Sequence, residues 1–169
     1  MRTEKQIQRK ANDLLRAAGV IEPPVDVISI ARFLGATIRH EIAKDDISGA
    51  LYRRDDGPVI GVNALHSQSR QRFTIAHEIG HLVLHEDVPV FIDRVYRRDT
   101  QSSEAVDPAE IEANKFAAAL LMPKDLILNA EPGRTLSSDD VEELARKFAV
   151  SQQAMTFRLE NLELPLELS

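Results

Sequence analysis

Two histidines and a glutamate near the middle of the chain have the spacing of a catalytic metal site. His77 and His81 are four residues apart in the run RFTIAHEIGHLVLH. On a helix this spacing puts both imidazoles on one face, one turn apart, so both can bind one metal ion. Glu78 follows His77 directly and can take a proton from an attacking water. The pattern predicts a zinc-dependent hydrolase with His77 and His81 as metal ligands and Glu78 as the catalytic base.

The same three residues could also meet on an amphipathic helix by coincidence. The chain has only 5 His in 169 residues, so such a coincidence is rare, on the order of one chain in a hundred. The flanking residues Phe73, Ala76 and Val83 follow the helical period, and no proline interrupts them. Imidazoles buried in the middle of such a helix need a partner, and a metal ion supplies one.

A catalytic zinc site takes a third protein ligand and keeps one position open. Residues 107–123, DPAEIEANKFAAALLMP, predict a second helix that carries two candidate carboxylates. Asp107 as N-cap, Pro108 at the first helical position and Glu110 at the third form a capping arrangement. This arrangement accounts for Glu110 without any chemistry.

Glu112 has a different setting on the same helix. It shares a face with Phe116 and Leu120, where an unpaired carboxylate would be costly to bury and a metal would satisfy it. We therefore predict Glu112 as the third ligand. Glu110 is the alternative, and a solvated Glu112 at the edge of the helix is a second one.

Composition limits the kind of metal site and the class of protein. There is no cysteine, which excludes a disulfide framework and a cysteine-rich zinc finger. Two imidazoles and a carboxylate suit zinc, with manganese or iron as alternatives. The start of the chain lacks the apolar core of a signal peptide, and no apolar run could span a bilayer, so we expect a cytoplasmic protein without membrane contact. The net charge of −6 argues against general binding of nucleic acid.

The expected fold is a single α+β domain over residues 1–169. Residues 1–35 predict N-terminal helices, 36–123 a sheet and the zinc-site helices, and 124–169 a C-terminal helical segment. Strand-like patterns predict a small antiparallel sheet before the metal-site helix, from residues 36–41, 47–53 and 58–63. Ser67 or Ser69 is expected to cap that helix, which ends near His85. Residues 86–106 predict a loop.

Stabilisation of the oxyanion in a hydrolase needs a donor beside the metal, and the sequence assigns none. The candidates are Tyr52, His66, His85, Tyr96 and Arg97. We expect His85 to be a partly exposed residue at the end of the helix, because it lies two turns from His77.

The C-terminal segment predicts two helices, capped at Ser137 and turning at Ser151, that resemble a helix-turn-helix. From Asp139 onward the sequence has seven acidic and three basic residues, and this net charge of −4 would repel phosphates. Packing against the catalytic part is therefore favoured over DNA binding, and recognition of a protein partner is a possible addition.

Most of the chain, from about Pro23 to Leu162, resembles the ImmA/IrrE family of bacterial metallopeptidases. The resemblance rests on RFTIAHEIGHLVLH together with EIEANKFAAALLMP, and extends to PPVDVISIARFLGATI, SGALYR and LARKFAVSQQAMTFRLENL. It implies a gluzincin-like zincin domain in which Glu112, the glutamate before Ala-Asn, is the third ligand. His77, His81 and Glu78 keep their roles. Some members carry a further regulatory domain, and this chain resembles a single-domain version.

The resemblance also implies a function. Members of the family cut a helix-turn-helix repressor and so relieve repression of mobile-element or stress-response genes, which implies a protein substrate and no direct binding of nucleic acid. Two other functions stay open. One is a toxin or effector of a toxin–antitoxin or phage-defence pair, and the other is a zinc-bound sensor or partner-binding module with little proteolysis. Oligomeric state is not indicated.

Overall fold

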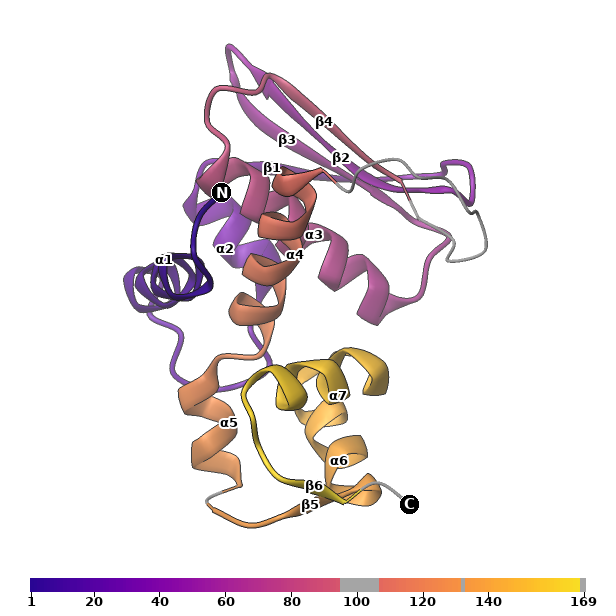
Figure 1. Cartoon of the computed structure of the whole chain (residues 1–169). Helices are drawn as coiled ribbons and strands as arrows, with labels where there is room; N and C mark the ends of the chain where they lie inside the picture. Colours follow the sequence, from indigo (N-terminus) through magenta and orange to yellow (C-terminus); the bar gives the residue numbers. More distant parts are fainter. Residues whose placement is uncertain (95–106, 132, 168–169) are drawn as a thin grey trace.

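The computed structural model describes residues 1–94, 107–131 and 133–167. A four-stranded sheet lies along one side of the long helix α3 (Gln68–Leu84), and α4 (Pro108–Leu121) packs on the other side. α1 (Glu4–Ala17) packs against α4, and α2 (Val27–Phe33) against α3. Figure 1 shows the sheet above these helices and a smaller helical group below them. The α+β class is confirmed.

The sheet has the order β1-β3-β2-β4 and is mixed. Its strands are β1 (Thr37–Glu41), β2 (Ile47–Arg54), β3 (Gly57–Asn63) and β4 (Val90–Arg94). β2 pairs antiparallel with both β3 and β4, but β1 pairs parallel with β3. The prediction of an antiparallel sheet is therefore wrong for this pair. β1 and β3 run the same way because β2 reverses between them, and they become neighbours because β2 lies on the far side of β3.

A second correction concerns residues 86–106, which we expected to be loop throughout. β4 lies within them and forms the outer edge of the sheet beside β2. Its pattern was hidden because the strand is short and follows a charged turn. Residues 95–106, the last part of this segment, lie outside the described residues.

The capping prediction for α3 is confirmed at Ser67. Its hydroxyl accepts a hydrogen bond from the backbone N–H of Arg70, which satisfies one of the free donors at the start of a helix. At the other end, Arg53 of β2 donates from Nη2 to the carbonyl oxygens of His81, Leu82 and His85 at 3.2, 3.2 and 3.0 Å. A cation there satisfies the last carbonyls and complements the helix dipole. Arg53 thereby fixes the sheet to the end of α3.

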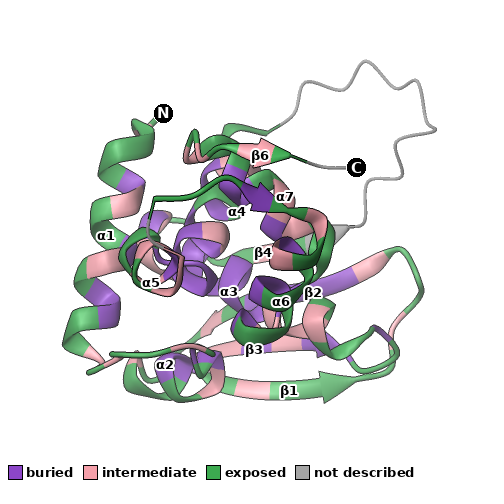
Figure 2. Cartoon of the chain, turned by 90° about the horizontal axis from the view of Figure 1, so that it is seen from below, coloured by how far each residue is buried: buried purple, intermediate pink, exposed green. Residues whose placement is uncertain are grey.

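α3 and α4 approach each other closely at Gly80. A Cβ added to this glycine would come within 3.1 Å of Cα and 3.2 Å of the carbonyl oxygen of Ala113. Such contacts are tighter than ordinary Cβ contacts, so a side chain at this position would require α3 or α4 to shift by a few tenths of an ångström. Figure 2 shows α3 and α4 as the most deeply buried helices, with α1 exposed along its outer side.

The C-terminal part contains α5 (Lys124–Ala130), α6 (Ser138–Phe148) and α7 (Gln152–Asn161). The short strands β5 (Leu136–Ser137) and β6 (Leu166–Glu167) pair in parallel beside them. Ser137 and Ser151 cap α6 and α7, as the sequence predicts. The helix-turn-helix likeness of this pair stays a prediction.

Arg158 connects α7 to the rest of the molecule. Its guanidinium is buried and donates to the carbonyl oxygen of Met122 at 3.0 Å and to Gln8 Oε1 at 2.7 Å. Burial lowers the pKa of Arg158 to about 10, so the group stays charged at neutral pH.

In the described part of the chain, no helix is long and apolar enough to cross a membrane.

Candidate metal centre

α3 carries His77, Glu78 and His81 into the interior of the protein. The three residues are 2%, 0% and 0% exposed, respectively. The two histidines are one turn apart and their Nε2 atoms are 3.0 Å from each other. The sequence prediction that both imidazoles share one face of a helix is therefore confirmed.

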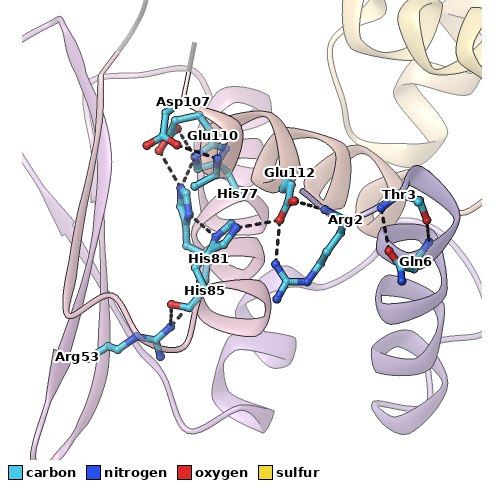
Figure 3. A network of polar contacts seen from close by, with 11 residues as sticks. Arg2, Thr3, Gln6, Arg53, His77, His81, His85, Asp107, Glu110 and Glu112 are labelled. Atoms are coloured by element: carbon cyan, nitrogen blue, oxygen red, sulfur yellow. Dashed lines mark hydrogen bonds and ion pairs between the residues drawn. The ribbon is translucent and has the colours of Figure 1, made fainter. Parts of the chain in front are cut away.

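The third residue of this group is Glu110, in the first turn of α4. Its Oε2 lies 3.0 Å from Nε2 of His77, and its Oε1 lies 3.1 Å from Nε2 of His81. Among the described residues, His77, His81 and Glu110 form the group whose ligand atoms could hold a metal ion, all within 4.8 Å of one another. Figure 3 shows the three side chains converging from two helices.

The structure does not bring Glu112, the predicted third ligand, into the group of His77 and His81, where Glu110 lies instead. Glu112 is buried, as we expected from its apolar face, at 4% exposed. Its carboxylate contacts Nε2 of His85 at 3.1 Å and Nη1 of Arg2 at 2.9 Å, and it accepts from the backbone N–H of Arg2. These partners satisfy the buried charge without a metal. Glu110, which we had explained by capping alone, turns its carboxylate to the histidines.

The other ring nitrogens of both histidines also have partners. Nδ1 of His77 is 2.9 Å from Oδ1 of Asn114, and Nδ1 of His81 is 3.0 Å from Nδ1 of His85. The ring of His81 stacks on Phe91 of β4, with centroids 3.8 Å apart. Contacts of this kind fix the orientation and tautomer of metal-binding histidines. The sequence analysis did not find Asn114 or Phe91, because their roles depend on which helix and strand face α3.

The pKa shifts of Glu110 and His81 favour the protonation states in which these residues bind a metal ion. Burial raises the pKa of Glu110, but hydrogen bonds with His77 and His81 outweigh it and bring this pKa to about 2. Burial lowers the pKa of His81, which favours the neutral imidazole. An ionised carboxylate and neutral imidazoles are the ligand forms of these residues.

The geometry also fits a small metal ion. Ligand atoms of a tetrahedral zinc site, with bonds of about 2.0–2.1 Å, lie about 3.3 Å from one another. The separations between His77, His81 and Glu110 are 3.0–3.1 Å. Both histidines use Nδ1 elsewhere and turn Nε2 inward. The residues present therefore fit a metal held by two imidazoles and one carboxylate.

Glu78 lies between α3 and the sheet. A Cβ built on Gly49 of β2 would lie 3.4 Å from its Oε1, an ordinary van der Waals contact, so this carboxylate lies close to the backbone of β2. Glu78 follows His77 on the helix and shares its interior position. The structure thus places a fully buried carboxylate next to the metal group, on its sheet side.

The candidate oxyanion donors are spread over the molecule. Tyr52 is 42% exposed on β2, and His66 is buried against Asn63, 3.4 Å from its amide nitrogen. His85 is engaged with His81 and Glu112, so it is more than the exposed end-of-helix residue that we expected. Tyr96 and Arg97 lie outside the described residues. None of the described candidates gains an assignment as oxyanion donor.

Comparison with known proteins places this site in a family. The model of the IrrE N-terminal-like domain, a peptidase family, matches residues 32–160. The radiation response metalloprotease IrrE of Deinococcus radiodurans is 35% identical over 107 residues, which are 60% of this chain and 30% of that protein. IrrE of Deinococcus deserti is 37% identical over 106 residues, which are 60% of this chain and 35% of that protein.

This chain thus spans about a third of the length of these curated relatives. A solved structure of a Mycobacterium tuberculosis transcriptional regulator has a TM-score of 0.62 and 22% identity, covering 95% of this chain and 57% of that one. At this identity the likeness shows the fold alone. The family match, by contrast, covers both helices of the metal group, and the chain belongs to the family of IrrE N-terminal-like domains that includes ImmA/IrrE metallopeptidases.

Proposed function

We propose that this protein is a zinc-dependent endopeptidase. The observation that carries the proposal is the convergence of two buried histidines, His77 and His81, with the half-buried Glu110, while Glu78 follows His77 on the same helix. Two imidazoles and a carboxylate are the ligand set of several catalytic zinc sites that cleave peptides. Membership in a peptidase family supports the same reaction.

A zinc ion bound there would supply Lewis acidity and bring the pKa of a water toward neutrality. Glu78 takes the proton from the attacking water and later donates it to the leaving nitrogen of the peptide. Asn114 and His85 hold the two imidazoles by their Nδ1 atoms, so that both Nε2 atoms stay directed inward.

The edge strand β4 supports a polypeptide as the substrate. In the described part of the chain, β4 pairs with β2 alone and is an edge strand of the sheet, and an edge strand can pair with an extended segment. Phe91 of this strand stacks on His81, which puts the edge next to the metal group. An extended peptide added along β4 would bind by its backbone and lie beside the site.

We propose a helix-turn-helix repressor as the substrate, cleaved to relieve repression of stress-response or mobile-element genes. Support comes from the family resemblance and from the relatives, which are named as radiation response metalloproteases. The net charge of −6 fits a protein that acts on a DNA-binding partner, since such partners carry basic surfaces.

The proposal is tested by co-expressing the protein with a helix-turn-helix repressor encoded beside it and analysing fragments by mass spectrometry. Wild type should cut the repressor, and Glu78→Gln should retain zinc while cutting about 10²–10⁴-fold more slowly. Equal cleavage by both would contradict the catalytic role of this site. If wild type leaves the repressor whole but cuts an unfolded protein such as casein, the substrate is wrong and the peptidase stands.

A further inference from the structure

We propose that His85, Glu112 and Arg2 form a relay that orients His81 in the metal centre, as positioning residues. We call these three residues the His85 relay. The inference rests on the proposed function, because it concerns the same metal centre, but it assigns a role to residues that the metal group does not include.

The relay is a continuous line of contacts from the metal group to the N-terminal segment. Nδ1 of His81 lies 3.0 Å from Nδ1 of His85, and Nε2 of His85 lies 3.1 Å from Oε2 of Glu112. Glu112 is held in turn by Arg2, through the guanidinium at 2.9 Å and the backbone N–H. Figure 3 shows these residues side by side, linking α3, α4 and the start of the chain.

Metal binding would fix where each proton lies in these contacts. With a metal ion on Nε2 of His81, which faces His77 and Glu110, Nδ1 would be the nitrogen of His81 that carries hydrogen and donates to His85. His85 then accepts at Nδ1 and carries its own proton at Nε2, which donates to Glu112. Glu112 accepts from both His85 and Arg2, as an ionised carboxylate can. Each hydrogen bond of the relay then joins a donor to an acceptor.

The carboxylate of Glu112 is buried and depends on its partners in the relay. The side chains of Glu112 and His85 are 5% and 11% exposed, and that of Arg2 is 38% exposed. A carboxylate buried to this degree is costly unless it is paired. Arg2 and His85 supply these partners, so the relay places a paired carboxylate against Nε2 of His85.

A role in positioning differs from a role in packing alone. A carboxylate–histidine partner makes the metal-binding imidazole more basic and holds its tautomer, and loss of such a partner weakens metal affinity about 10–100-fold. A pure packing contact between α3 and α4 would change the stability of the protein and leave the tautomer of His85 unspecified. Metal affinity and tautomer state separate the two roles.

The affinity experiment is a competition titration of Zn²⁺ between the purified chain and a chromogenic chelator. We expect His85→Ala and Glu112→Ala to bind Zn²⁺ about 10–100-fold more weakly than wild type. His85→Gln should recover part of this loss, since its amide oxygen can accept from His81. His40→Ala, at an exposed histidine, and Glu143→Gln, at an exposed glutamate on α6, are the matched controls and should bind as wild type does.

The second readout is the tautomer of His85, measured by two-bond ¹H–¹⁵N correlation in the zinc-loaded protein. With 5 His in the chain, single substitutions assign every signal. His85 should carry its proton at Nε2 in wild type and lose this preference in Glu112→Ala. Wild-type affinity in both alanine variants, or a wild-type His85 proton at Nδ1, would overturn the relay. A wild type that binds no Zn²⁺ would instead overturn the proposed function, and the relay with it.

Discussion

Glu110 and Asn114 lie one turn apart on α4 and contact the two ring nitrogens of one histidine. Oε2 of Glu110 is 3.0 Å from Nε2 of His77, and Oδ1 of Asn114 is 2.9 Å from Nδ1. α4 therefore supplies Glu110 to the metal group and also supplies Asn114, which orients His77.

This pairing predicts the behaviour of Asn114→Ala. Without the amide oxygen, Nδ1 of His77 loses its acceptor and the ring is free to turn, so zinc affinity should fall about 10–100-fold. Competition titration measures the change. Asn114→Asp keeps an acceptor in place and should bind zinc more tightly than the alanine variant. Equal affinities for wild type and Asn114→Ala would show that this contact does not position His77.

Glu110 and Glu112 should respond differently to substitution by glutamine. Glu110→Gln removes the carboxylate from the metal group, and we expect zinc affinity to fall by more than about 100-fold, beyond the loss typical of an outer contact. Glu112→Gln keeps an oxygen that can accept from His85 and should lose less. Zinc content after dialysis, measured by atomic emission, ranks the two variants. The opposite ranking would restore Glu112 as the third ligand.

Arg53→Met should destabilise the protein by about 2 kcal/mol, because charged hydrogen bonds to the last carbonyls of α3 are lost. Unfolding by urea measures this free energy. Arg54→Met, at the next residue, is the matched control. The side chain of Arg54 is 54% exposed and pairs with Asp56 at 3.2 Å, so its loss should cost less than about 1 kcal/mol. Equal effects of the two variants would argue against the helix-capping role of Arg53.

Asp140 should make stability depend on pH. The Arg134 guanidinium and the Ser137 N–H and hydroxyl hold the pKa of Asp140 well below its ordinary value. A depressed folded-state pKa stabilises the protein above the unfolded-state pKa of about 3.9, and this contribution is lost as the pH falls below that value. The difference in Tm between wild type and Asp140→Asn should be present at neutral pH and shrink below about pH 4. Asp139→Asn is the neighbouring control, and a difference that is constant with pH would contradict the prediction.

The sequence predicted the metal-site helix well because its information is local. Ser67 as cap and the 3.6-residue period depend on residues within one segment, and the structure has both. Local information is not sufficient for the other helix of the metal group, α4. Its apolar face correctly indicated that Glu112 is buried, but burial does not say what lies opposite. Arg2, at a separation of 110 residues, satisfies Glu112, and no local pattern indicates a contact so distant.

The sheet shows the same limit. The three expected strands appear close to their predicted bounds, because alternation and turn residues are local signals. Which strands become neighbours depends on packing against α3, so the parallel pair of β1 with β3 and the edge position of β4 were not predictable.

The contact between Arg2 and Glu112 has a practical consequence for anyone who expresses this protein. Met1 is 87% exposed and directly precedes the residue that holds Glu112. An affinity tag fused ahead of Met1 would tether a bulky segment beside Arg2, and a cleavage scar would change the local charge. Metal affinities measured on such a fusion would then differ from those of the untagged chain. A tag placed after Ser169 leaves this end of the molecule unaltered.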